Sequence, residues 1–333
     1  MKVTCFKVVG NNWTFTKHRI FNSTNMTTSN TFPSLFQGLS PKDDEVLYIF
    51  GNGFDISHGI KSKYSDFKKF VLENENGNHV DLMDIFFSQK EDFWCDIEEA
   101  LGDYDEKNIY EFCKPDEEID LDHTMRDIAR AEDGPDWLFK PELDKFTEEF
   151  HDWVNQIDIS VARPLCSLPL NSKYLTFNYT ETLEHVYNIP SQQICHIHGS
   201  RLKNNEKYVI GHNSLRDENT HREDDGDMPF EVDTMNKIIG WMNELYKNTK
   251  TIIKEHSDFF SKLANIKCVV VKGHSLNNID WPYFDEVASV VDKKARWVFN
   301  CFSNEDVVNV KKYISYSGIT NCSYKKSCIT FSL

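Results

Sequence analysis

The stretch "LYIFGNGFDISHGI", residues 47–60, decides the fold, because four apolar residues run directly into Gly-Asn-Gly. In open α/β sheets, buried strands end at loops of this kind, and ligands bind beyond the carboxyl ends of the strands. Gly51 and Gly53 would let a phosphate or ribose approach the backbone, and the following helix would offer N–H groups to an anion. The alternative is a plain strand–helix turn with Asp55 as helix cap. The loop alone leaves both open, since the dinucleotide fingerprint wants a third glycine at Ile56 and the lysine of the Walker loop is missing.

Strands and helices alternate through the second half of the chain. This alternation favours a mostly parallel sheet with helices on both faces. We therefore predict an α/β fold, a Rossmann-like three-layer sandwich with helical insertions. The apolar runs predict core strands at 46–50, 173–178, 193–199, 267–273 and 296–302, a short strand at 207–213, and a last strand near 328–332.

The composition along the chain predicts the domain organisation. Residues 1–44 read as an irregular N-terminal arm, rich in Ser, Thr and Asn, and residues 45–333 as a single α/β domain. A helical and acidic insertion is expected at about 78–165. Within it, residues 103–136 are acidic and broken by Pro and Gly, which predicts short helices, and a helix of roughly 20 residues is expected over 141–162.

The net charge of −16 argues against general binding to nucleic acid or to anionic lipid, which require Lys and Arg to displace counterions. No apolar run is long enough to span a bilayer, and the N-terminus has no clear signal-peptide core. Nine scattered cysteines without a Cys-x-x-Cys pair favour reduced thiols. We expect a cytoplasmic protein without a membrane partner and without nucleic acid as a ligand.

Three more strand ends carry polar residues. Because the carboxyl ends of parallel strands share one rim of a sheet, we expect these loops to converge with the glycine loop on one cavity. Each cluster alone has a simpler explanation, such as a helix cap or a structural histidine. The clusters are Asn178 and Tyr179; His198, Gly199 and Ser200; and Gly273, His274, Ser275 and Asp280.

These motifs together resemble the AbiH family of bacterial proteins associated with abortive infection against bacteriophage. The resemblance covers roughly residues 46–290 and rests on "IFGNGFDISHGI", "FWCDIEEAL", "LTFNYTETLE", "HIHGS" and "KGHSLNNIDWPYF". Their order also resembles, distantly, the sirtuin-like superfamily, where equivalent segments surround NAD. This chain departs from sirtuins at Asp55, where they carry serine, and lacks the zinc-binding cysteine pairs. The resemblance thus implies an NAD-like ligand, without zinc and without expected deacylase activity.

The resemblance implies roles for individual residues. His198 is the predicted general base and Asn178 the residue that orients a water, which together make the predicted catalytic pair. Asp55 would bind a hydroxyl or stabilise positive charge, and Ser275 and Asp280 would contact the adenosine end. The full set of predicted nucleotide contacts is Gly51, Asn52, Gly53, Phe54, Asp55, His58, Gly199, Gly273, His274, Ser275 and Asp280.

Three functions remain open from the sequence. The first is hydrolysis of NAD to nicotinamide and ADP-ribose, silenced until a phage-derived trigger or homo-oligomerisation activates it. The second is a nucleotide-binding sensor without turnover. The third is a nuclease or another nucleotide hydrolase, for which Asp55, Glu98 and Asp280 would gather around magnesium. Glu98 and His212 are further candidates for the cleft.

Overall fold

The computed structural model describes residues 8–9, 12–13, 41–74, 78–88, 93–114, 124–202, 207–222 and 228–326. The chain forms two compact units, Met1–Leu35 and Phe36–Leu333. In the first unit, β1 (Val8–Val9) pairs antiparallel with β2 (Asn12–Trp13). Most of the predicted arm over 1–44 lies outside the described residues.

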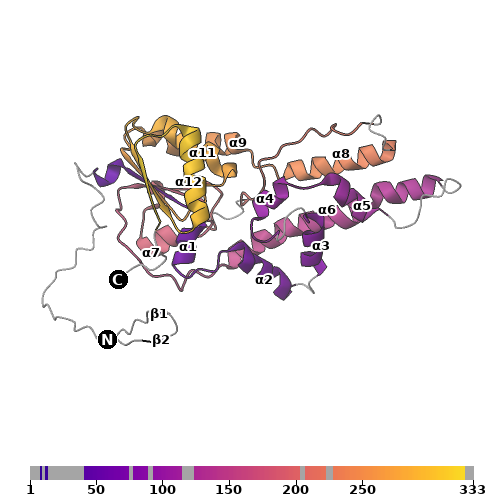
Figure 1. Ribbon diagram of the computed structural model, residues 1–333, viewed down its shortest axis with the longest axis horizontal. Helices are drawn as coiled ribbons and strands as arrows, with labels where there is room; N and C mark the ends of the chain where they lie inside the picture. The colour runs from indigo at the N-terminus through magenta and orange to yellow at the C-terminus, as the bar shows by residue number, and fades with distance from the viewer. Residues whose placement is uncertain are drawn as a thin grey trace. The chain divides into compact units, whose positions relative to one another are not determined.

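The second unit contains a parallel sheet of six strands (Figure 1). The strand order β5-β4-β3-β6-β7-β8 is the Rossmann order 3-2-1-4-5-6 when β3 is counted as the first strand. The predicted α/β, Rossmann-like architecture is therefore confirmed. The strands are β3 (Val46–Phe50), β4 (Lys173–Thr176), β5 (Ile194–His196), β6 (Cys268–Lys272), β7 (Arg296–Cys301) and β8 (Cys322–Lys326).

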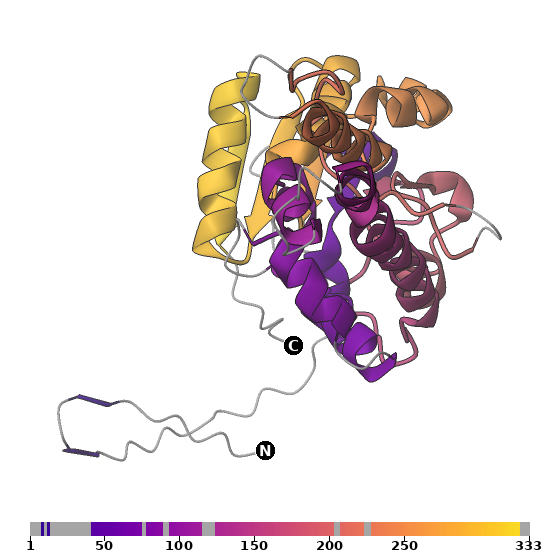
Figure 2. The ribbon, with the colours of Figure 1, turned by 90° about the vertical axis from the view of Figure 1, so that its right-hand side faces the viewer.

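Alternating side chains of β3 face two different hydrophobic clusters, as expected of a strand with helices on both faces. Leu47 and Ile49 are buried with α11 (Trp281–Val290) and α12 (Asn304–Ser317). Tyr48 and Phe50 are buried on the other face with residues of α1 (Asn52–Ser57) and α7 (Thr182–Tyr187). Figure 2 shows α12, in yellow, against the strands.

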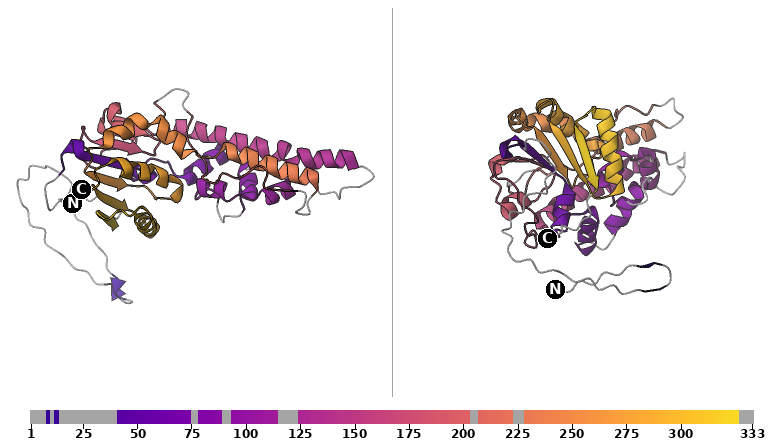
Figure 3. Two further views of the ribbon diagram at one scale, coloured as in Figure 1. Left: turned by 90° about the horizontal axis from the view of Figure 1, so that it is seen from above. Right: turned by 60° about the vertical axis from the view of Figure 1, so that its left-hand side comes forward.

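A third cluster fills the helical part of this unit. Phe67 lies at its centre and contacts the rings of Trp94, Phe146, Phe150 and Trp153. Figure 3 shows two of its long helices, α6 and α8, side by side. The helices are α2 (Tyr64–Asn74), α3 (Asn78–Phe86), α4 (Ile97–Gly102), α5 (Glu106–Cys113), α6 (Thr124–Gln156) and α8 (Pro229–Glu244).

Helix α6 is longer than the sequence predicts. It covers 33 residues and continues through Pro135, where short helices were expected, and through Pro141, where the predicted helix begins. It ends at Gln156, before the predicted end at 162. Its buried apolar side chains include Phe139, Leu143 and Phe146, so packing outweighs the unfavourable proline positions. Gly134 also has a structural reason, because a Cβ there would lie 2.4 Å from the carbonyl oxygen of Cys113 at the end of α5.

One predicted strand is wrong, and the strand predicted near 328–332 lies outside the described residues. Residues 207–213 do not join the sheet: Val209 N–H donates to His198, and His212 forms an isolated bridge with Tyr246. The last described strand, β8 at 322–326, is one that the sequence did not predict. Its polar sequence suits an edge strand, whose side chains are mostly exposed.

The remaining helices are short. They are α9 (Thr249–Glu255) and α10 (Ser257–Phe260), with 3-10 turns at Asp43–Glu45, Ser191–Gln193, Ser261–Leu263 and Asn278–Asp280. Within the described part of the chain, no helix combines the length and the apolar character needed to cross a bilayer.

Candidate functional site

A cavity of about 480 Å³ lies at the carboxyl ends of β3, β4, β5, β6 and β7. It includes the loops after β3 and β6, which flank the point where the strand order reverses and where Rossmann folds bind ligands. The expected convergence of the four loops is therefore observed. The predicted site residues that line this cavity are Gly51, Asn52, Gly53, Asp55, Asn178, His198, Gly273, His274, Ser275 and Asp280.

Three of the predicted contact residues, Phe54, His58 and Gly199, do not line this cavity. Phe54 is buried against Phe50 on the sheet, and His58 is held by the Phe54 carbonyl and the Tyr187 hydroxyl. Gly199 has a φ of +93° and packs against Lys207, so its glycine is required by the turn. The sequence gives the order of residues in a loop but not the direction in which each one points.

The glycines of the first loop serve loop–loop packing. A Cβ on Gly51 would lie 2.6 Å from the Gly273 carbonyl oxygen, and one on Gly53 would lie 2.8 Å from the Gly273 Cα. The Gly53 amide donates to Gly273 O at 2.8 Å, and the Phe54 amide donates to Gly51 O at 2.9 Å. These amides are therefore already used, and the expected phosphate cradle of backbone N–H groups is not supported.

Asn178 and His198 are buried polar residues with unsatisfied atoms. Asn178 is 6% exposed and His198 is 4% exposed, and both line the cavity. Asn178 Oδ1 and His198 Nε2 have no hydrogen-bond partner among the described residues. The residues on either side of Asn178 hold the imidazole, since the His198 ring lies 5.0 Å from that of Phe177 and 6.5 Å from that of Tyr179. Two buried groups with unused hydrogen-bonding capacity thus face a space that a ligand or water can fill.

Asp55 adds a third unsatisfied atom. Its Oδ2 accepts a hydrogen bond from Thr180 Oγ1, whereas Oδ1 has no partner among the described residues. Burial raises the pKa of Asp55 to about 6, although the hydrogen bond from Thr180 opposes this rise. Asp55 is 1% exposed and points to the cavity from α1, as the hydroxyl-binding prediction requires.

A buried lysine connects two carboxylates behind the cavity. Lys247 Nζ lies 2.5 Å from Glu98 Oε1 and 3.4 Å from Asp280 Oδ1, and its side chain is fully buried. His274 Nδ1 accepts from the Leu276 amide, so Nε2 carries the proton that faces Asp280 Oδ2 at 3.4 Å. Asp280 Oδ1 also lies 3.7 Å from His198 Nε2.

The pKa values in this cluster follow from burial and charge. Burial raises the pKa of Glu98 to about 7, against the opposing effect of Lys247. Burial acts to raise the pKa of Asp280 as well, but the Lys247 ammonium and His274 lower it below its ordinary value. Burial lowers the pKa of His198 well below 6.5, and the charge of Lys247 adds to this effect. His198 is therefore a neutral imidazole at neutral pH.

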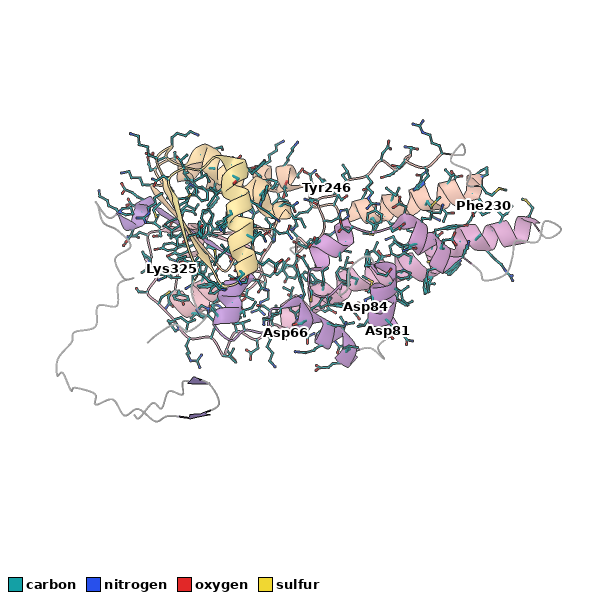
Figure 4. All side chains as sticks on the ribbon, in the orientation of Figure 1. Asp66, Asp81, Asp84, Phe230, Tyr246 and Lys325 are labelled. Atoms are coloured by element: carbon teal, nitrogen blue, oxygen red, sulfur yellow. The ribbon has the colours of Figure 1, made fainter. Side chains whose placement is uncertain are left out.

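Lys247 is a site residue that the sequence does not reveal, because buried lysines are rare and its surroundings are polar. Figure 4 labels its neighbour Tyr246, which follows α8. His212 fixes this segment: its amide donates to Leu245 O, and its carbonyl accepts from the Lys247 amide at 2.7 Å. His212 is therefore a structural residue here, since it does not line the cavity and its Nε2 bonds the Met242 carbonyl.

The cavity wall also contains residues from the helical insertion. Asp96 caps α4 by accepting from the Glu99 amide, and its other oxygen accepts from Asn277. Burial raises the pKa of Asp96. Glu98 lines the cavity too, as proposed from its helical spacing. The aromatic lining residues are Tyr64, Trp153, Phe177, Tyr179 and Phe302.

The carboxylates of this site do not form a metal-binding group. Among the described residues, no set of three or more His, Cys, Asp or Glu side chains is placed to hold a metal ion. The Lys247 ammonium already lies between Glu98 and Asp280, where the magnesium-dependent alternative would need its cation.

Comparison with known proteins supports a family assignment. The family model described as bacteriophage abortive infection AbiH matches residues 47–301. Neither the curated proteins nor the solved structures gave a match. The matched residues span most of the chain, run from β3 to the end of β7, and contain Asn178, His198 and Asp280. This chain therefore belongs to the AbiH family of bacteriophage abortive infection proteins.

Proposed function

We propose that the protein binds an NAD-like nucleotide in this cavity and hydrolyses the bond between nicotinamide and ribose, thereby lowering NAD in an infected cell. The observation that carries the proposal is the pair of buried, unpartnered atoms, Asn178 Oδ1 and His198 Nε2, in one cavity at the switch point of a Rossmann-like sheet. The sirtuin-like resemblance points the same way and remains a prediction.

The reaction replaces one bond at C1′ with another and transfers one proton. The C1′–N bond breaks and its electron pair goes to the pyridine nitrogen, so nicotinamide leaves as a neutral molecule. The oxygen of a water bonds to C1′, and its proton goes to His198 Nε2. Asn178 Oδ1 accepts the other hydrogen of that water and orients its lone pair toward C1′.

The surroundings of His198 suit a general base. Its lowered pKa keeps the imidazole neutral, and the Asp280 carboxylate, whose Oδ1 lies 3.7 Å from Nε2, stabilises the imidazolium that forms. Asp55 Oδ1, buried and unpartnered, is available to accept from a ribose hydroxyl. A positioned base of this kind contributes about 10²–10⁴-fold to a rate.

The test measures nicotinamide release and phage defence together. Purified protein is incubated with NAD, and cells expressing the chain are infected while NAD is followed. We expect NAD loss that falls about 10²-fold or more in Asn178→Ala and in His198→Asn. Asn155→Ala and His151→Asn, on an exposed part of α6, are matched controls. Protection from phage without any NAD loss would contradict the proposal.

A ligand sensor without turnover is the second candidate, and one observation favours it. Residues of the helical insertion, including Asp96, Glu98 and Trp153, line the same cavity as the strand loops. An occupant would therefore contact both parts of the unit and could change how they pack. Tight NAD or ADP-ribose binding with no product in infected cells would support this function over hydrolysis.

A further inference from the structure

The cavity wall carries more acidic than basic side chains. Lys63 is the one Lys or Arg among the described lining residues. Five carboxyl residues line the cavity: Asp55, Asp96, Glu98, Asp280 and Asp306. Lys63 is exposed, so solvent weakens its effect inside the cavity. Lys247 behind the wall is already shared by Glu98 and Asp280. A phosphate group would be repelled here, whereas a cation would be attracted.

Two buried oxygen atoms in the cavity wall can accept hydrogen bonds from a ligand. Asp55 Oδ1 and Asn178 Oδ1 are acceptors in residues that are more than nine-tenths buried. Ribose hydroxyls and a carboxamide N–H can donate to them, but an ionised phosphate oxygen cannot. The Gly53 and Phe54 amides, which could have held a phosphate, donate to backbone carbonyls instead.

The aromatic lining suits a flat cation. Tyr64, Trp153, Phe177 and Tyr179 face the same space as the carboxylates. Aromatic faces attract cations, and this attraction is stronger when water is excluded. A pyridinium ring offers both a positive charge and a surface that stacks.

We infer that the cationic N-riboside end of the substrate enters this cavity, and that its phosphates stay outside the acidic wall. The inference rests on the proposed function and specifies which half of the nucleotide the site recognises. It predicts discrimination by charge, because NAD and NADH differ chiefly in the positive charge of the nicotinamide ring.

Binding is measured by calorimetry on the full chain with NAD, NADH and ADP-ribose. We expect NAD to bind at least about tenfold more tightly than NADH and ADP-ribose, a difference of about 1.4 kcal/mol. Asp96→Asn should reduce the NAD-to-NADH preference at least about threefold, since an asparagine keeps the α4 cap but removes the charge. Asp105→Asn, which caps α5 in the same way and does not line the cavity, is the matched control.

Each outcome has a definite meaning. Equal affinity for NAD and NADH, or ADP-ribose binding as tightly as NAD, would overturn the inference while leaving the proposed function intact, because NAD still binds. Failure of all three nucleotides to bind would overturn the proposed function and the inference with it. A preference for NAD that is lost in Asp96→Asn and kept in Asp105→Asn supports both.

Discussion

The ammonium of Lys247 lies 2.5 Å from a carboxylate oxygen of Glu98, and the lysine side chain is completely buried. Such a pair is costly to desolvate, so its retention at the wall of a cavity points to a role in the site. The same ammonium lies 3.4 Å from Asp280, which in turn faces His198 and His274. The buried ammonium thus pairs with two carboxylates, and one of these carboxylates also faces two imidazoles beside the predicted reaction centre.

Lys247→Met should destabilise the fold strongly. Removing the ammonium leaves Glu98 and Asp280 buried without their cation, and breaking a buried pair costs about 3–5 kcal/mol. Lys237→Met is the control, because Lys237 pairs with Asp136 at a site where the lysine is 44% exposed, and it should cost no more than about 1 kcal/mol. Urea unfolding at pH 7 measures both. Equal effects of the two variants would show that the buried cluster does not contribute to stability.

Asp55→Asn should change how stability depends on pH. The pKa of Asp55 is raised from 3.8 to about 6 by burial, so between these values the unfolded chain loses a proton that the folded chain keeps. The free energy of unfolding therefore falls as pH rises from about 4 to about 6, by up to about 3 kcal/mol from this residue, and this loss is complete above pH 7.

An asparagine at position 55 does not titrate, so the variant lacks this fall in the free energy of unfolding. Wild type should therefore become less stable relative to Asp55→Asn as the pH rises from about 4 to about 6. Urea unfolding of both proteins at pH 4, 5, 6 and 7 measures the difference. Asp66→Asn is a suitable control, because Asp66 accepts from an amide at the start of α2 and lies outside the cavity. A wild-type-to-variant difference that stays constant from pH 4 to 7 would contradict the raised pKa.

The sheet was predictable because its strands are short apolar runs that end in polar loops. β3 begins and ends as expected, and Asn178, His198 and Gly273 reach one cavity because parallel strands share a rim. The edge strand at 322–326 was not predictable, since polar side chains on both faces carry no period that marks burial. Helix α6 was underestimated because local proline signals say nothing about long-range packing.

The charged half of the site depends on contacts far apart in sequence. The helical insertion must pack over the loops before Lys247 contacts Glu98 and Asp280. No local sequence pattern predicts such a long-range contact. The one available signal was the helical spacing of Glu98 from Trp94. Phe54 and His58 were included because they are neighbours in the chain, but the turns of α1 direct them toward the core.

The contact between the two glycine loops should be intolerant of a methyl group. Gly273 has a φ of +71°, and a Cβ there would lie 2.3 Å from the Phe54 amide nitrogen. Gly318 has nearly the same φ, +70°, but nothing lies within 4 Å of its added Cβ. Substituting alanine at these two glycines therefore separates two destabilising effects, the left-handed backbone conformation and the steric clash of the added Cβ.

Gly318→Ala should cost about 1–2 kcal/mol, which is the price of the left-handed conformation alone. Gly273→Ala should cost clearly more and should also weaken NAD binding, because relieving the clash must move the loop after β3 or the loop after β6, and both line the cavity. Thermal unfolding and calorimetry on both variants measure these effects. Equal destabilisation by the two substitutions, with NAD binding unchanged in both, would mean that the loops can separate freely and that their close approach does not shape the site.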